Sequence, residues 1–193
     1  MKYNIFLMLI QLLFTIIIFS VSAVDKKTIS TAPLGPFQLI FKQLYNCNPT
    51  QKNKIQHNVY ISHRSGSALL LGNSTLEIPL DDSFFLEIKM ALKDTSGNWK
   101  ENSFMHKTPK ACSSFKKTMG KNWPAFINGI GFKTTDCPIP SGTYIAQGFD
   151  LSLFMDTNFP KVFIYGTYRV HMYYSLKNEI FGCIVCIMEF KRP

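Results

Sequence analysis

The chain has 193 residues, and its 21 lysine and arginine side chains outnumber its 12 aspartate and glutamate side chains, which gives a net charge of +9 with histidine neutral. The basic residues are scattered and accompany no recognition motif, so a nucleic-acid partner is not expected. An anionic membrane surface is the expected electrostatic partner, and a basic surface that is merely solvated is the alternative.

The amino-terminal segment has the pattern of a secretory signal peptide. A positive residue, Lys2, precedes an apolar run over residues 5–19, and small residues suited to cleavage follow at Val21-Ser22-Ala23. The apolar run has about 15 residues, whereas a transmembrane helix needs about 20. We therefore predict a signal peptide over residues 1–23, a secreted extracellular protein, and a single domain over residues 24–193.

Between residues 37 and 107, apolar residues recur with a period of two, which is typical of strands with one buried face. In the clearest example, Phe84, Leu86, Ile88, Met90 and Leu92 alternate with mostly polar neighbours. Residues that favour turns separate the alternating segments at Gly72-Asn73, Asp81-Asp82 and Ser96-Gly97-Asn98. The pattern predicts antiparallel strands.

The segment from Cys112 to Phe132 lacks this alternation. Phe115, Met119 and Trp123 fall at helical spacing, and Pro124 is expected to stop or kink a helix. We predict a short helix or an irregular excursion that ends near Trp123.

The strand pattern returns after Pro140. Ile145, Phe149, Leu151 and Leu153 are predicted to share one strand face, and two further strands follow over residues 167–175 and 180–191. About eight short strands with one irregular insertion predict an all-β fold, either a β-sandwich or a related cup.

Five cysteines follow the predicted cleavage site, and in an oxidising compartment an odd number leaves one unpaired. Cys183 and Cys186 have the C-x-x-C spacing of some metal and redox sites. No second ligand pair accompanies them, and they fall on opposite faces of a predicted strand. We predict no metal site and no cofactor.

No motif of a known hydrolase is present, since the chain lacks G-x-S-x-G, H-E-x-x-H and a phosphate-binding glycine loop. We therefore expect that the protein is not an enzyme. A lipid or glycan hydrolase remains a third hypothesis, and His171 and Asp150 would be the first residues to test.

Aromatic residues are abundant, with 17 Phe, 8 Tyr and 2 Trp, and many lie outside the predicted strands. Each one alone is expected to complete the core of a sandwich. As a group, loop aromatics beside proline and glycine suggest the rim and lid of an apolar cavity. The residues predicted to form this ligand site are Phe115, Met119, Trp123, Phe126, Ile127, Phe149, Leu151, Leu153, Phe154, Phe159, Phe163 and Tyr168.

Three short motifs near the carboxyl terminus carry a family resemblance. They are Cys137-Pro-Ile-Pro-Ser-Gly142-Thr143-Tyr144, Gly166-Thr-Tyr168-Arg169-Val170 and Gly182-Cys183-Ile184. In this order, the motifs resemble those of the ganglioside activator and of insect CheB-type chemosensory proteins, which belong to the ML lipid-recognition superfamily. The resemblance covers residues 112–193 well and the amino-terminal half only by its strand pattern.

The resemblance implies an immunoglobulin-like sandwich opened into a β-cup, with an apolar cavity between its sheets. It implies a carrier or presenter of a lipid or other hydrophobic ligand, in a lipid-transfer, activator or chemosensory role, with a receptor or hydrolase as partner. It further implies disulfides Cys47–Cys183 and Cys112–Cys137, with Cys186 as a free thiol in the core. The chain has fewer cysteines around the insertion than the activator, so the ganglioside itself is not implied.

The sequence also leaves an alternative function open and contains one candidate glycosylation site. The alternative function is a secreted co-receptor or adhesion sandwich with a filled core. Asn73 begins the only N-glycosylation sequon, because Pro49 disqualifies Asn48, and its predicted turn favours modification.

Overall fold

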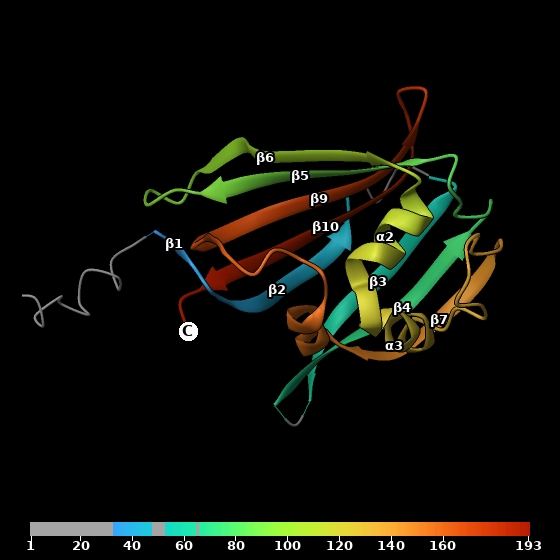
Figure 1. Cartoon of the computed structure of the whole chain (residues 1–193), viewed down its shortest axis with the longest axis horizontal. Coiled ribbons are helices and arrows are strands. Elements are labelled where there is room, and N and C mark those ends of the chain that lie inside the picture. The colour runs from blue at the N-terminus through green and yellow to red at the C-terminus, as the bar shows by residue number, and fades with distance from the viewer. Residues whose placement is uncertain (1–32, 48–52, 65) are drawn as a thin grey trace, which may run out of the picture. The chain divides into compact units, whose positions relative to one another are not determined.

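The structure is a computed structural model that describes residues 33–47, 53–64 and 66–193. Residues Leu34–Pro193 form one compact unit (Figure 1). The predicted signal peptide, residues 1–23, lies outside the described residues.

The described residues are mostly in strands, with one short helical insertion, which confirms the predicted all-β sandwich class. The strands are β1 (Leu34–Gly35), β2 (Gln38–Asn46), β3 (Ile55–Arg64), β4 (Ser67–Leu76), β5 (Phe85–Lys93), β6 (Trp99–Pro109), β7 (Gly142–Asp150), β8 (Phe163–Ile164), β9 (Gly166–Leu176) and β10 (Glu179–Lys191). The helices are α2 (Ala111–Met119) and α3 (Trp123–Gly129), and the 3₁₀ turns are η2 (Gly120–Asn122) and η3 (Leu151–Asp156).

The main sheet has the order β6-β5-β9-β10-β3-β4-β7, and β2 also pairs with β10. Strand β10 pairs with β2 along most of its length, but it pairs with β3 only between Gly182 and Ile55. A side chain at Gly182 would meet the Ile55 carbonyl oxygen at 2.9 Å, so this close approach needs glycine. We call β6-β5-β9-β10-β2 the large portion of the sheet and β3-β4-β7 the small portion.

The alternation in the sequence explains which side of the large portion is buried. Backbone pairing places Leu86 beside Tyr174, Ile88 beside Met172, Met90 beside Val170 and Leu92 beside Tyr168. These side chains therefore line one face, which we call the inner face. Helix α2 and the segment around η3 lie over this face (Figure 1).

The insertion contains two helices, which corrects the predicted end of a single helix near Trp123. Pro124 lies in the first turn of α3, where its missing N–H costs nothing and its fixed φ suits a helix. The proline therefore begins a helix at the point where we expected one to stop.

The strand predicted through Leu151 and Leu153 is also wrong in part. Strand β7 ends at Asp150, whose carboxylate accepts a hydrogen bond from the Ser152 N–H and begins η3. The pairing of β4 with β7 also shifts register, and Ile145 faces outward with 68% of its surface exposed.

Both implied disulfides, Cys47–Cys183 and Cys112–Cys137, are present. Cys186 is a buried free thiol, and burial raises its pKa to about 12. Two disulfides are typical of proteins from an oxidising compartment. No helix among the described residues is long and apolar enough to cross a bilayer.

The predicted turn at Gly72-Asn73 is wrong, because both residues lie within β4. The β3–β4 hairpin turns instead near Gly66, which has a φ of +83°. Asn73 remains exposed, so its side chain is accessible for modification from a strand rather than from a turn.

Candidate ligand site on the inner face

The residues predicted to form an apolar ligand site fall into two groups in the structure. The larger group shares one hydrophobic cluster, the insertion cluster, and contains Phe115, Met119, Trp123, Phe126, Ile127, Phe149, Leu151, Leu153 and Phe154. The remaining Phe159, Phe163 and Tyr168 lie in a second cluster, the lid cluster, with Phe37, Met90 and Phe190.

The insertion cluster is packed ring against ring. The Trp123 and Phe126 rings stack with centroids 5.9 Å apart, and the Phe115 ring meets Phe126 edge-on at 5.1 Å. Phe126 also meets Phe149 of β7 edge-on at 5.3 Å, which joins α3 to the small portion of the sheet. The Trp123 indole N–H donates to the Thr135 carbonyl oxygen at 2.7 Å. The rings therefore pack directly against one another and join α3 to the sheet.

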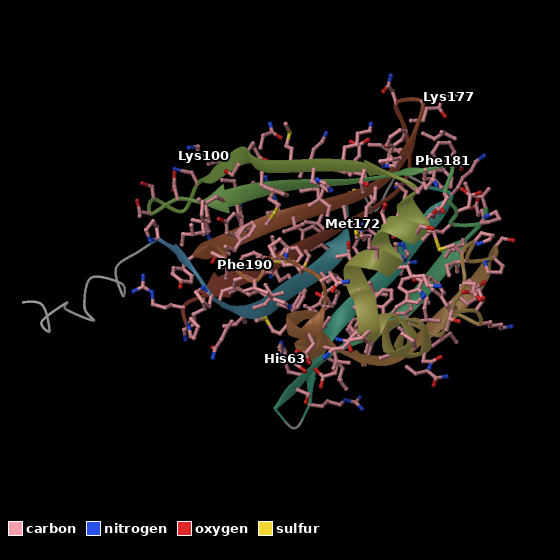
Figure 2. All side chains as sticks on the ribbon, viewed as in Figure 1. His63, Lys100, Met172, Lys177, Phe181 and Phe190 are labelled. Atoms are coloured by element: carbon pink, nitrogen blue, oxygen red, sulfur yellow. A yellow bond between two sulfur atoms is a disulfide. The ribbon has the colours of Figure 1, made fainter. Side chains whose placement is uncertain are left out.

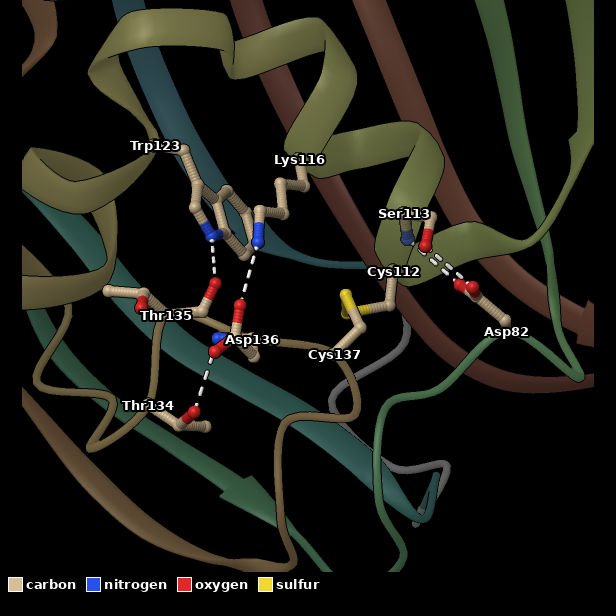
Figure 3. Close-up of polar contacts among 9 residues, drawn as sticks. All are labelled: Asp82, Cys112, Ser113, Lys116, Trp123, Thr134, Thr135, Asp136 and Cys137. Carbon is tan, nitrogen blue, oxygen red and sulfur yellow. Dashed lines mark hydrogen bonds and ion pairs between the residues drawn. A yellow bond between two sulfur atoms is a disulfide. The ribbon is translucent and has the colours of Figure 1, made fainter.

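Polar contacts and a disulfide fix the insertion to its surroundings (Figure 3). The Asp82 carboxylate accepts hydrogen bonds from the Ser113 N–H at 2.8 Å and from the Ser113 hydroxyl at 2.6 Å. These bonds satisfy an amide in the first turn of α2, where a negative charge is also favoured. Lys116 pairs with Asp136 at 3.0 Å. Together with Cys112–Cys137, these contacts hold α2 at several points.

The lid cluster covers the other end of the inner face. We call residues 151–164, from η3 to β8, the lid segment. Phe163 of the lid segment stacks on Phe190 of β10, with ring centroids 4.4 Å apart. Phe190 also meets Phe37 at 4.8 Å and Tyr168 at 5.3 Å. The rings of Phe159 and Phe163 therefore attach the lid segment to β9 and β10.

The lid segment is also bonded to the carboxyl end of α2. The backbone N–H of Asn158 donates to the Thr118 carbonyl oxygen at 2.8 Å, and its side-chain amide donates to the Lys117 carbonyl oxygen at 2.8 Å. Asn122 donates to the Leu153 carbonyl oxygen at 2.8 Å. The last carbonyls of a helix lack partners within it, so Asn158 serves as a cap supplied by the lid segment.

Between the two clusters, four side chains of the inner face form a partly exposed apolar strip. This inner strip consists of Ile88, Val170, Met172 and Met188. Val170 and Met188 pack against both clusters, so the strip connects them. Met172 lies near the middle of β9, on the part of the sheet beside α2 (Figure 2). At the edge of the sheet, Phe104 lies opposite Met90 and is 42% exposed.

A small cavity lies beneath the lid segment. It has a volume of about 10 Å³ and is lined by Phe37, Leu39, Phe154, Met155, Phe159, Pro160 and Lys161. This volume holds about one water molecule. Uptake of a lipid chain at this position therefore requires the lid segment to move away from the inner face.

One buried polar pair, which we did not predict, lies on β3 and β4, near the pairing of Gly182 with Ile55 that joins the two portions of the sheet. The His57 Nδ1 and the Ser74 hydroxyl are 2.8 Å apart, and the imidazole packs against Tyr174. Burial lowers the pKa of His57 to about 4, and its Nε2 has no partner among the described residues. Both side chains are buried, so a substrate in solution does not reach them in this structure.

His171 and Asp150, the residues named for a hydrolase, are each engaged locally. His171 lies on the outer face, where its Nδ1 is 3.0 Å from the Tyr173 hydroxyl. Its ring also lies close to Cys47 and Cys183, with ligand atoms mutually within 4.8 Å. The two sulfurs are joined in a disulfide, so neither offers a thiolate to a metal ion.

The comparisons with known proteins assign no family. No family model matches the chain, and no curated protein shows significant similarity to it. The site must therefore be interpreted from its own residues.

Proposed function

We propose that this protein is a secreted carrier or presenter of a lipid or another hydrophobic ligand, built on a β-cup of the ML lipid-recognition type. The ligand would bind along the inner face, between α2 and the lid segment. A receptor, a hydrolase or an anionic membrane surface would receive the ligand or supply it.

The inner strip is the observation that supports this proposal most directly. Its four apolar side chains face the interior of the fold yet remain partly exposed, and they lie where the two aromatic clusters meet. Each CH₂ group moved from water to such a surface gains about 0.8 kcal/mol. A chain that lies along the strip and displaces the lid segment would replace the ring contacts of Phe163 with contacts of its own.

Close ring packing in the insertion supports a second candidate, a co-receptor or adhesion sandwich with a filled core. Trp123, Phe126 and Phe149 pack at ordinary contact distances, and the cavity beneath the lid segment is small. In this alternative the lid segment stays closed, and partner proteins bind only the surface.

Uptake of a fluorescent fatty acid separates the two candidates. The test compares the wild-type protein with Met172→Gln, which places an amide in the inner strip. The matched control is Met105→Gln on the opposite face of the sheet, where Met105 is 62% exposed. We expect saturable uptake by the wild type, a dissociation constant about tenfold higher for Met172→Gln, from a loss of about 1.4 kcal/mol, and little change for Met105→Gln.

Native mass spectrometry of protein purified from a secreting culture provides the second measurement. An apolar molecule bound in a one-to-one ratio and recovered by organic extraction is the expected result. Absence of both a bound molecule and fatty-acid uptake would remove the carrier proposal and leave the filled sandwich.

A further inference from the structure

The outer face of the large portion carries a row of cations that the proposed lipid site does not use. Lys93, Arg169, Lys89 and Lys107 occupy successive outward positions, and we call them the cation row. Backbone pairing fixes their order, with Ala91 beside Arg169 and Glu87 beside Lys107. Outward positions repeat about every 6.8 Å along a strand, so the row covers about 20 Å.

Aromatic rings hold each cation of the row in place. Lys93 and Arg169 lie over the same ring, that of Trp99, at 5.7 and 5.0 Å from its centroid. The other two cations have a ring each, with Lys89 over Tyr173 at 5.5 Å and Lys107 over Phe85 at 4.8 Å. A ring contact restrains the charged group and leaves its other N–H groups free to bind an anion. Such restraint lowers the ordering cost of binding.

Among the described residues, two carboxylates form ion pairs with cations of the row. Glu87 pairs with Lys107 at 2.7 Å and accepts a hydrogen bond from Ser175, while Glu101 pairs with Arg169. Lys89 and Lys93 are exposed, and among the described residues neither forms an ion pair within 4 Å of a carboxylate, although Lys89 lies near enough to Glu87 to help lower its pKa. The row therefore keeps a net positive charge, concentrated at these two lysines.

We propose that the cation row binds a linear anionic polysaccharide that carries sulfate or carboxylate groups at regular intervals. A row of restrained cations at successive levels of three paired strands, β9, β5 and β6, matches an extended polymer with repeated anions. The two disulfides are typical of the oxidising compartments in which such polysaccharides occur. A bilayer, in contrast, is normally engaged by several apolar side chains that project beyond the charges. Among the described residues on the outer face of β5, β6 and β9, Met105 is the one large apolar side chain that is strongly exposed.

Calorimetry with heparin oligosaccharides and elution from immobilised heparin test this proposal. The row variant is Lys89→Gln/Lys93→Gln/Lys107→Gln, and the matched control is Lys116→Gln/Lys121→Gln/Lys133→Gln, which removes the same charge from the insertion and the loop after it. We expect the row variant to bind heparin at least tenfold more weakly and the control to change affinity less than twofold. Wild-type affinity should fall as the NaCl concentration rises.

Equal losses in the two triple variants would overturn the proposal, because net charge alone would then explain binding. Tighter binding to phosphatidylserine vesicles or to duplex DNA than to heparin, with the same dependence on the row, would also overturn it. Thermal unfolding checks both variants. If the row variant unfolds, Lys89→Gln/Lys93→Gln replaces it, since neither lysine forms a close ion pair in the described part of the chain. Lipid uptake is measured separately, so its outcome does not affect this test.

Discussion

The two ends of the inner face are closed in different ways. At the insertion end, α2 and α3 are held by the Cys112–Cys137 disulfide, by Asp82 and by a large set of buried rings. At the lid end, the buried members of the cluster, among the described residues, are Phe37, Met90, Tyr168 and Phe190. Regions with fewer buried apolar contacts open at a lower free energy than the global core does.

This difference indicates which part of the fold would move. In the lid segment only Leu151 and Thr157 are buried, and Phe159 and Phe163 are partly exposed, whereas Trp123 and Ile127 of the insertion are almost wholly buried. Opening at the lid end would expose less apolar surface than opening at the insertion end, and so cost less. The insertion is therefore expected to stay rigid, and the lid segment to be the part that would open for the ligand we propose.

The largest expected effect tests whether the insertion is tightly packed. Trp123→Ala removes a side chain that is 3% exposed, together with its hydrogen bond to the Thr135 carbonyl oxygen. We expect a loss of about 4 kcal/mol in the free energy of unfolding, measured by chemical denaturation. Met105→Ala, at an exposed site, should change it by about 0.5 kcal/mol or less. A loss near 1 kcal/mol for Trp123→Ala would show that the insertion is loosely packed.

The next effect concerns His57, which lies at the end where the two portions of the sheet join. Its pKa falls from the model-peptide value of 6.5 to about 4 on burial, so the unfolded state takes up the proton first. The free energy of unfolding is therefore unaffected by the titration of His57 above pH 6.5. It falls by roughly 3 kcal/mol in total as the pH drops from 6.5 towards 4. Denaturation curves collected across this range measure the slope.

His57→Gln should remove most of that slope, whatever its effect at pH 7. His171→Gln is the control, because burial and the neighbouring Arg169 also lower the pKa of His171 and give a slope of the same sign. The pKa of the Glu87 carboxyl is lowered as well, by hydrogen bonds from Lys107 and Ser175. The stability that this carboxylate contributes changes only at pH values below 4.5. A steep slope retained by His57→Gln between pH 6.5 and 4.5 would assign the pH dependence to other groups.

The sequence allowed a good prediction of the inner face, for a simple physical reason. Side chains alternate along a strand, so the apolar positions of β5, β9 and β10 had to share a face wherever these strands pair. Leu86, Met90 and Tyr168 are accordingly buried. The inner strip could not be predicted, because it depends on the register that places Ile88 beside Met172.

Other features depended on contacts between distant parts of the chain. The aromatic residues of the predicted ligand site were chosen by residue type, but whether their rings surround a space or fill it depends on packing between α3 and β7. His57 and Ser74 are 17 residues apart and meet only through the β3–β4 pairing. The inward position of His57 between Ile55 and Val59 was the one signal of its burial.

A matched pair of variants compares the two ends directly. Phe163→Ala in the lid segment and Phe115→Ala in the insertion each remove a partly buried ring, and each should cost about 2 kcal/mol. Hydrogen exchange followed by mass spectrometry should then differ between them. We expect faster exchange over residues 154–165 in Phe163→Ala and unchanged exchange there in Phe115→Ala. Equal acceleration in both variants would mean that the lid and insertion open together.

The smallest effect isolates the polar attachment of the lid segment. Asn158→Ala removes the side-chain hydrogen bond to the Lys117 carbonyl oxygen but keeps the backbone bond to Thr118, so we expect a loss of about 1 kcal/mol. Asn128→Ala, at an exposed position of α3, is the control and should lose nothing. Because this attachment joins the lid segment to α2 and lies outside the aromatic contacts, its loss should favour opening without altering the inner strip. Fatty-acid uptake should therefore become faster in Asn158→Ala, whereas slower uptake would mean that the bond shapes the bound state rather than the closed one.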